Sequence, residues 1–170
     1  ELARRMHDRM QAFGIHPVLM GFSGMVPKDF GAKRPDASVI EQGLWCGFSR
    51  PAMLRVYGSK GKDFFEPAAD TFYEKQREVF GPVTHYYAVD PFHEGGNMGD
   101  MEPAAVYRAV QRKMLENDPK AIWLLMQWQG QISDEKLSGL CKPQQALVLD
   151  LQADRRPYHE MMERHKTPWI

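Results

Sequence analysis

Short apolar segments alternate with helical segments along this chain, and no other feature limits the choice of fold as strongly. The apolar segments are residues 15–22, 83–92, 121–128 and 145–151. Segments with a helical spacing of apolar residues are 1–13, 64–80, 102–117 and 158–166, with a shorter one at 133–140. Apolar strands that alternate with helices indicate parallel strands covered on both faces. The pattern therefore predicts an α/β fold, either a barrel or an open sheet.

Glycine and proline mark the ends of these segments and one long loop between them. Gly14, Gly81 and Pro119 lie where three of the predicted helices end, as helix-terminating residues do. The segment from about residue 28 to 62 is rich in glycine, proline and charge, so we expect a loop that passes over a functional site. Residues 167–170 have the pattern of a fifth strand.

Composition argues against several classes of partner and cofactor. The chain has 22 basic and 22 acidic residues, so no net charge attracts it to nucleic acid. It has no apolar run of about 18 residues and no signal-peptide pattern, so we expect no membrane span. No glycine-rich phosphate-binding motif follows a predicted strand, which counts against nucleotide cofactors. Cys46 and Cys141 lack metal-ligand spacing, so neither a zinc site nor a disulfide framework is expected.

Unusual side chains gather where the predicted strands end. In chain order they are Asp90, His93, Glu94, Trp128, Gln129, Asp150 and Asp154. The carboxyl ends of parallel strands meet at one edge of the sheet, and ligands of α/β proteins bind there. We therefore expect these side chains to form a site.

The segment DPFHEGGNMGD carries the densest group of reactive side chains. Asp90 and Glu94 supply carboxylates, and His93 can donate or accept a hydrogen bond. Glycosidases need two carboxyl groups beside the scissile bond, one of them protonated, so Glu94 is a candidate acid. The same three residues also permit a metal-dependent hydrolase, although no HExxH motif is present.

Three tryptophans have different expected roles. Trp123 lies inside an apolar strand and is expected in the core. Trp128 follows that strand and Trp45 lies in the glycine-rich loop, so each can stack on a sugar ring or pack beneath the loops. A non-catalytic carbohydrate-binding domain, in which these two tryptophans hold a sugar and Glu94 only hydrogen-bonds it, is therefore an alternative to an enzyme.

Six blocks in the same order give the chain a specific resemblance to a known family. They are RMQAFGIHPVLMGFSGMVP, QGLWCGFSRPA, DPFHEGG, AIWLLMQWQG, LVLDLQADRRP and the terminal PWI. On these blocks the chain resembles glycoside hydrolase family 89, the α-N-acetylglucosaminidases, and is most similar to the bacterial branch. The resemblance implies a TIM-like (β/α) barrel, of which residues 1–170 would be one segment within a single domain, incomplete at both ends.

The resemblance also implies an activity and a set of site residues. Members hydrolyse terminal α-linked N-acetylglucosamine from glycans with retention, using two glutamates. The position of the family's acid/base glutamate matches Glu94, and its nucleophile matches no residue of this chain. Trp45 and Trp128 match tryptophans that line the sugar site, and His93 and Asp90 are expected to bind substrate.

Further expectations concern partners, location and one departure. The resemblance implies a glycan substrate, contact with the rest of the same polypeptide, export to the periplasm, cell surface or medium, and neither a metal nor an organic cofactor. The segment alone is expected to be inactive. Gln127 stands where the family commonly has glycine beside the tryptophan that matches Trp128, so we expect Gln127 to change the shape of the pocket.

Overall fold

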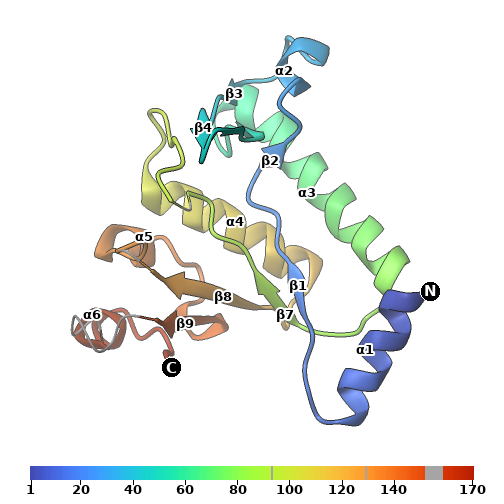
Figure 1. The fold of residues 1–170 in the computed structure, drawn as a ribbon. Helices are drawn as coiled ribbons and strands as arrows, with labels where there is room; N and C mark the ends of the chain where they lie inside the picture. The colour runs from blue at the N-terminus through green and yellow to red at the C-terminus, as the bar shows by residue number, and fades with distance from the viewer. Residues whose placement is uncertain (93, 129, 152–158) are drawn as a thin grey trace.

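The main sheet of the protein has four parallel strands. The structure is a computed structural model that describes residues 1–92, 94–128, 130–151 and 159–170, with the backbone alone for 59–62. The strands lie in the order β1 (Val18–Met20), β7 (Tyr86–Ala88), β8 (Ile122–Gln127) and β9 (Ala146–Asp150). Every neighbouring pair is parallel. The predicted α/β fold is therefore confirmed (Figure 1).

Helices connect these strands, close to where the apolar spacing predicted them. In chain order they are α1 (Leu2–Ala12), α2 (Phe30–Lys33), α3 (Ser59–Phe80), α4 (Pro103–Asn117), α5 (Asp134–Ser138), the 3₁₀ turn Pro143–Gln145 and α6 (His159–Arg164). The predicted fifth strand is present as a parallel bridge between Trp169 and Val148.

Helix α3 begins five residues earlier than its sequence pattern predicts. It runs from Ser59 to Phe80 and carries Pro67 in its interior. Proline is usual in the first turn of a helix, where its missing N–H costs no hydrogen bond. With the predicted start at residue 64, Pro67 would lie near the first turn, whereas in the structure it lies in the helix interior.

Helices α3 and α4 cover one face of the sheet. Tyr73 of α3 packs edge-on against Tyr87 of β7, with ring centroids 5.7 Å apart. Tyr107 of α4 packs against Trp123 of β8 at 5.1 Å, and Trp123 is fully buried. Alternate side chains of a strand point to opposite faces, so these contacts assign one set of strand residues to the helix layer.

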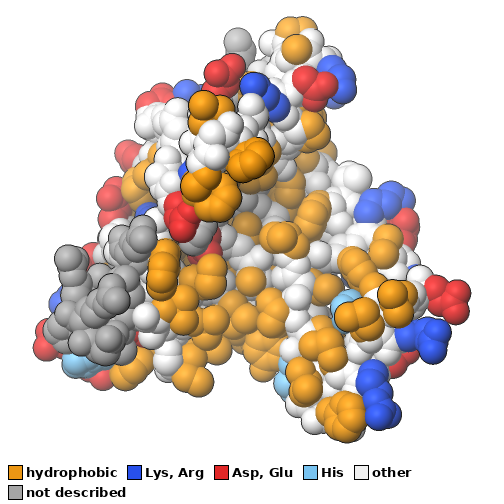
Figure 2. Space-filling model, in the orientation of Figure 1, with side chains coloured by type: hydrophobic (Ala, Val, Ile, Leu, Met, Phe, Trp, Pro, Cys, Tyr) orange, Lys and Arg blue, Asp and Glu red, His pale blue; other side chains and the backbone are white. Residues whose placement is uncertain are grey.

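The opposite face of the sheet is open, which corrects the expectation that both faces are covered. In β8 every second residue is only partly buried, and Val18 and Met20 of β1 are 48% and 64% exposed. Figure 2 shows hydrophobic side chains gathered over this part of the molecule. No described element lies across this face, so the apolar side chains there lack the cover that the sequence pattern implied.

The segment from residue 28 to 62 is not the plain loop that we predicted. It contributes β3 (Val39–Ile40) and β6 (Ala52–Leu54) to a small sheet with β2 (Met25–Val26). It also forms a hairpin of β4 (Leu44–Trp45) and β5 (Phe48–Ser49). Strands of two or three residues are too short for an alternating pattern to be read. Both small sheets lie beyond the carboxyl ends of β1 and β7 (Figure 1).

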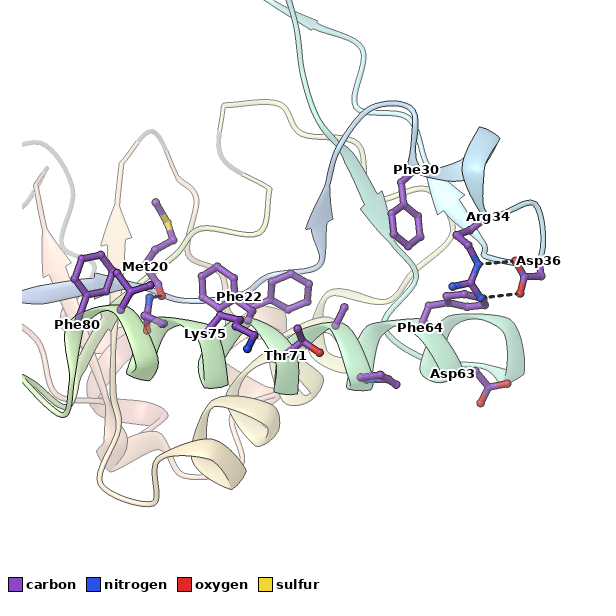
Figure 3. A pocket seen from close by; sticks show the side chains of 15 residues that line it. Met20, Phe22, Phe30, Arg34, Asp36, Asp63, Phe64, Thr71, Lys75 and Phe80 are labelled. Carbon is purple, nitrogen blue, oxygen red and sulfur yellow. Dashed lines mark hydrogen bonds and ion pairs between the residues drawn. The ribbon is translucent and has the colours of Figure 1, made fainter.

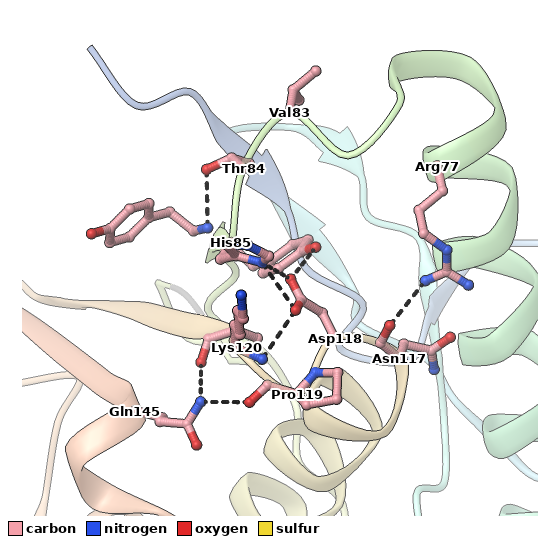
Figure 4. A network of polar contacts seen from close by, with 12 residues as sticks. Arg77, Val83, Thr84, His85, Asn117, Asp118, Pro119, Lys120 and Gln145 are labelled. Atoms are coloured by element: carbon pink, nitrogen blue, oxygen red, sulfur yellow. Dashed lines mark hydrogen bonds and ion pairs between the residues drawn. The ribbon is translucent and has the colours of Figure 1, made fainter. Parts of the chain in front are cut away.

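A polar network joins the elements at the opposite edge of the sheet. The Asp118 carboxylate, just after α4, accepts hydrogen bonds from the Tyr87 hydroxyl at 3.0 Å and the Lys120 N–H at 3.1 Å. It also contacts Nδ1 of His85 at 2.7 Å (Figure 4). Burial and the Asp118 charge both raise the pKa of Tyr87. The amino ends of the strands lie at this edge. In α/β barrels, residues at that end of the strands contribute to stability and the catalytic residues lie at the other end.

Candidate active site

Glu94 lies in the loop that follows β7, in an unusual backbone conformation. Its φ is +47°, and that of Gly95 is +78°. Left-handed φ is routine for glycine but rare for glutamate, because the Cβ crowds the backbone. A non-glycine residue in this region persists when its surroundings hold it there. The contacts around Glu94 supply that restraint.

The carboxyl group of Glu94 meets the β4–β5 hairpin. The indole Nε1 of Trp45 donates a hydrogen bond to Glu94 Oε2. The two-residue turn of the hairpin, Cys46 and Gly47, has φ of +49° and +83°, as tight hairpin turns require. That turn brings Phe48 opposite Trp45 across the hairpin. Trp45 is 48% exposed, so it retains free ring surface beside the carboxyl group.

The peptide groups of Glu94 are held by two side chains from distant parts of the chain. The Arg50 guanidinium donates to the Glu94 carbonyl at 2.6 Å. The side-chain amide of Gln131 is assigned the orientation in which its nitrogen faces an acceptor and its oxygen faces a donor. In this orientation the nitrogen donates to the Phe92 carbonyl at 3.1 Å. The amide oxygen then accepts from the Glu94 N–H at 3.2 Å. Both sides of this residue are thus fixed.

The glycine-rich loop after Glu94 is bound to the same hairpin region. The buried side chain of Gln42 donates to the Asn97 carbonyl at 2.7 Å and accepts from the Asn97 N–H at 2.8 Å. Gly96 packs closely against the loop, since a Cβ there would lie 3.0 Å from Phe92 Cα. These contacts fix the loop on both sides of Glu94.

A cavity of about 350 Å³ opens beside Glu94. Met25, Phe48 and Pro51 form apolar parts of its wall, and Asp90 and Glu94 contribute carboxylates. Binding sites for small ligands combine apolar walls with a few polar groups in this way, and about 300 Å³ is their lower size range. The structure therefore brings together three of the proposed site residues, Trp45, Asp90 and Glu94.

Asp90 has a structural contact as well as a place in the cavity wall. Its Oδ1 accepts from the Met126 N–H at 3.4 Å, which joins the carboxyl ends of β7 and β8. Burial raises the pKa of the Tyr107 phenol, and the Asp90 charge raises it further. Burial lowers the pKa of Lys136, against the opposing effect of Asp90. The charge of Asp90 therefore acts on the helix layer as well as on the cavity.

The remaining predicted site residues have different outcomes. Trp128 follows β8 and is 37% exposed, but it is not among the described residues that line this cavity. Asp150 ends β9, where its N–H donates to the Ile170 carbonyl at 2.8 Å. His93, Gln129 and Asp154 lie outside the described residues.

Gln127 does not shape the cavity in the way we expected. It belongs to the strand face that packs on the helices and is fully buried. Its Oε1 accepts from the Ile132 N–H at 2.8 Å, and its side chain is not part of the cavity wall. Because residues of a strand alternate between faces, Gln127 instead holds the loop after β8.

Sequence reasoning missed Arg50, Gln131 and Phe48 as parts of the site. Arg50 and Phe48 occur in the block QGLWCGFSRPA, where only Trp45 was given a role. The available signal was a single cation between aromatic and proline residues in a glycine-rich segment. That signal does not indicate which carbonyl the cation reaches.

A hollow with a greater volume lies elsewhere in the described structure. It is a groove of about 1040 Å³ along α3, with Phe22, Phe64, Phe72 and other apolar side chains in its wall (Figure 3). The two cations of its wall are engaged in ion pairs, Arg34 with Asp36 and Lys75 with Glu78. The rest of the wall is mostly apolar, so the smaller cavity at Glu94 is the candidate active site.

Neither a metal-binding cluster nor a membrane-spanning helix occurs among the described residues. Within residues 1–92, 94–128, 130–151 and 159–170, no three His, Cys, Asp or Glu side chains are placed to hold one metal ion. His93, one of the three ligands considered, is outside that set. None of the described helices is long and apolar enough to cross a membrane.

A family model and a curated relative similar to this chain both carry the name α-N-acetylglucosaminidase. The family model for the α-N-acetylglucosaminidase (NAGLU) TIM-barrel domain matches residues 1–170. Human α-N-acetylglucosaminidase is 29% identical over an alignment of 169 positions, and the match covers 93% of this chain and 22% of the human protein.

Solved structures give the same result. A family 89 glycoside hydrolase from Clostridium perfringens in complex with PUGNAc is 53% identical, with a TM-score of 0.92 over 98% of this chain and 19% of that one. A variant of the C. perfringens enzyme with two glutamates replaced by glutamine, solved with its substrate GlcNAc-α-1,4-galactose, has a TM-score of 0.91. The chain thus spans about a fifth of the length of these relatives.

The match to the family model covers every residue of the chain, and the parallel sheet with its helix layer has the architecture that this model describes. We conclude that the chain belongs to the α-N-acetylglucosaminidase family, glycoside hydrolase family 89, and corresponds to part of its TIM-barrel domain.

Proposed function

We propose that the protein containing this chain removes terminal α-linked N-acetylglucosamine from glycans, and that Glu94 is its general acid/base. The observation that carries the proposal is the placement of Glu94 in the wall of a cavity of about 350 Å³, with its carboxyl group hydrogen-bonded to Trp45. The C. perfringens relative, 53% identical, has been solved with GlcNAc-α-1,4-galactose as its substrate, which supports the same class of glycan here.

The proposed reaction proceeds in two steps with retention. A second carboxylate, outside this chain, attacks the anomeric carbon while Glu94 gives its proton to the departing glycosidic oxygen. Glu94 then takes a proton from water, and the resulting oxygen displaces the carboxylate from the sugar. Protons and electron pairs balance with two carboxyl groups alone, so the proposal needs no metal or organic cofactor.

The other site residues have proposed roles in binding the sugar. Trp45 lies beside the cavity with an exposed ring and offers a surface for the apolar side of a pyranose. Asp90, a residue of the cavity wall, has the proposed role of accepting a hydrogen bond from a sugar hydroxyl. The roles of Trp128 and His93 remain predictions, as do export and the assignment of residues 1–170 to a single domain.

The test is hydrolysis of an aryl α-N-acetylglucosaminide by the full-length protein. Wild type, Glu94→Gln and Glu94→Ala are compared, with Glu135→Gln, an exposed glutamate of α5, as the matched control. We expect the Glu94 variants to lose about 100-fold or more in kcat/KM, the range for a general acid. Azide should restore turnover of Glu94→Ala on an activated substrate, because a small anion can replace the activated water.

Other outcomes separate the alternatives. If Glu94→Gln equals wild type and Glu135→Gln, the acid/base assignment is wrong. If wild type binds N-acetylglucosamine but hydrolyses nothing, the carbohydrate-binding alternative is favoured. If a chelator abolishes turnover and added metal restores it, the metal-dependent alternative with Asp90, His93 and Glu94 is favoured.

A further inference from the structure

We propose that Arg50 and Gln131 are positioning residues that hold Glu94 in its left-handed backbone conformation and so aim its carboxyl group into the cavity. The inference rests on the proposed function, because it assigns these residues a role in the acid/base step. Each acts on a peptide group of Glu94, one on its C=O and the other on its N–H.

The backbone of Glu94 explains why such residues are needed. A glutamate at φ +47° lies in a region that disfavours side chains with a Cβ. Released from its restraints, this residue would relax toward negative φ, and the Cα–Cβ bond would turn with it. The carboxyl group would then leave its place beside Trp45. The conformation and the direction of the acid are therefore coupled.

The β4–β5 hairpin region supplies two contacts to Glu94, one to its side-chain carboxyl group and one to its backbone carbonyl. Trp45, on the first strand, contacts the carboxylate, and Arg50, directly after the second strand, contacts the carbonyl. Arg50 is itself restricted, since Pro51 follows it and its N–H donates to the Gly43 carbonyl at 3.1 Å. A short, closed hairpin thus fixes the two groups relative to each other.

Gln131 provides a further restraint from the loop after β8. It follows β8, and its amide joins the Phe92 carbonyl to the Glu94 N–H across the two loops. It therefore joins the loop after β7 to the loop after β8 through hydrogen bonds. Arg50 is 44 positions and Gln131 is 37 positions from Glu94 in sequence, so only the folded chain brings the three together.

The experiment measures how activity depends on the leaving group. Full-length wild type, Arg50→Met, Arg50→Lys and Gln131→Met are assayed with 2,4-dinitrophenyl and 4-methylumbelliferyl α-N-acetylglucosaminides. The ratio kcat/KM reports the step in which the leaving group departs. The methylumbelliferyl group needs more help from an acid in that step than the dinitrophenyl group does. Arg55→Met is the control, because Arg55 pairs with Asp100 outside the cavity.

We expect Arg50→Met to lower kcat/KM by about 10- to 100-fold for the methylumbelliferyl substrate and by less than about threefold for the dinitrophenyl substrate. Arg50→Lys should recover part of the loss, since it retains one donor. Gln131→Met should show the same pattern with a smaller loss, and Arg55→Met should equal wild type on both substrates.

Each remaining result counts against the inference. An equal loss on both substrates, or a rise in KM alone, would assign Arg50 to stability or to substrate binding. If a thermal unfolding measurement shows that Arg50→Met is not folded, the activities of Arg50→Lys and Gln131→Met decide in its place. Glu94→Gln is run in parallel: if it shows the leaving-group pattern and the Arg50 and Gln131 variants do not, only this inference fails. If Glu94→Gln equals wild type, the proposed function fails.

Discussion

The indole nitrogen of Trp45 donates a hydrogen bond to the carboxylate of Glu94, 49 positions away in the sequence. The bond joins the exposed β4–β5 hairpin to the loop after β7, and both residues line the same cavity. A tryptophan that fits a sugar-binding surface is thus also a hydrogen-bond partner of the proposed acid.

Replacing Trp45 with phenylalanine should separate these two properties. Trp45→Phe keeps an aromatic face but removes the N–H, so we expect kcat/KM on an aryl α-N-acetylglucosaminide to fall by about tenfold, the lower end for a charge-assisted hydrogen bond. Stability should change little, because Trp45 is half exposed. Trp169→Phe is the matched control, since Trp169 has a similar exposure of 42% and contacts His159. Equal activity in the two variants would mean that the hydrogen bond from Trp45 to Glu94 does not contribute to catalysis.

Tyr73 should stabilise the protein through its hydroxyl group. The buried Phe22 N–H donates to the Tyr73 hydroxyl at 3.1 Å, and burial raises the pKa of Tyr73 to about 12. Tyr73→Phe leaves this N–H without a partner in the core, so we expect the free energy of unfolding to fall by about 1–3 kcal/mol.

Tyr57 provides the control for that measurement. Its hydroxyl accepts from the Glu102 N–H at 2.8 Å, but Tyr57 is 37% exposed. Water can replace the lost hydroxyl there, so Tyr57→Phe should cost less than about 0.5 kcal/mol in urea unfolding. A loss for Tyr57→Phe as large as that for Tyr73→Phe would contradict the dependence on burial.

The ion pairs of Lys113 should make stability depend on pH in the acidic range. Burial alone would raise the pKa of Asp70 and of Glu116, but hydrogen bonds from Lys113 lower both below their ordinary values. A carboxyl group with a lowered pKa stabilises the fold above its unfolded pKa, and this contribution is lost as the pH falls through the folded pKa. The wild type should therefore lose stability between about pH 5 and pH 2.

Lys113→Met tests this dependence by removing the cation while keeping the packing. Both carboxylates are about half exposed, so we expect a loss of about 1 kcal/mol or less at pH 7 and almost none near pH 2. Lys33→Met, which breaks the exposed Lys33–Asp29 pair, should change stability less at every pH. A difference between wild type and Lys113→Met that stays constant with pH would be inconsistent with the ion pairs.

Close packing of α4 and α5 should make Gly139 intolerant of a side chain. A Cβ at Gly139 would lie 2.1 Å from the Ala104 carbonyl oxygen, a backbone atom that cannot move aside easily. Gly139→Ala should therefore lower the free energy of unfolding by about 1–3 kcal/mol. Ser138→Ala, at the exposed neighbouring position, should change it by less than about 1 kcal/mol. Similar unfolding curves for the two variants would show that the helices can separate without cost.

Local sequence patterns determined the order and type of the main elements of this protein. The apolar runs around 83–92 and 121–128 and the helical spacing of 102–117 correspond to β7, β8 and α4, because side-chain periodicity and helix-ending residues act over a few neighbouring positions. The placement of Asp90 and Glu94 beyond a strand end followed from the same patterns, since parallel strands end at a common edge.

Only the tertiary structure decided which of these residues meet. The short strands of the 28–62 segment depend on pairing with distant partners, and no periodicity marks them. The contacts of Glu94 with Trp45, Arg50 and Gln131 join three separate segments through single hydrogen bonds, which leave no repeating trace in the sequence. The burial of Gln127 and the exposure of Val18 and Met20 likewise depend on what packs against each face of the sheet, and that is a property of the folded chain.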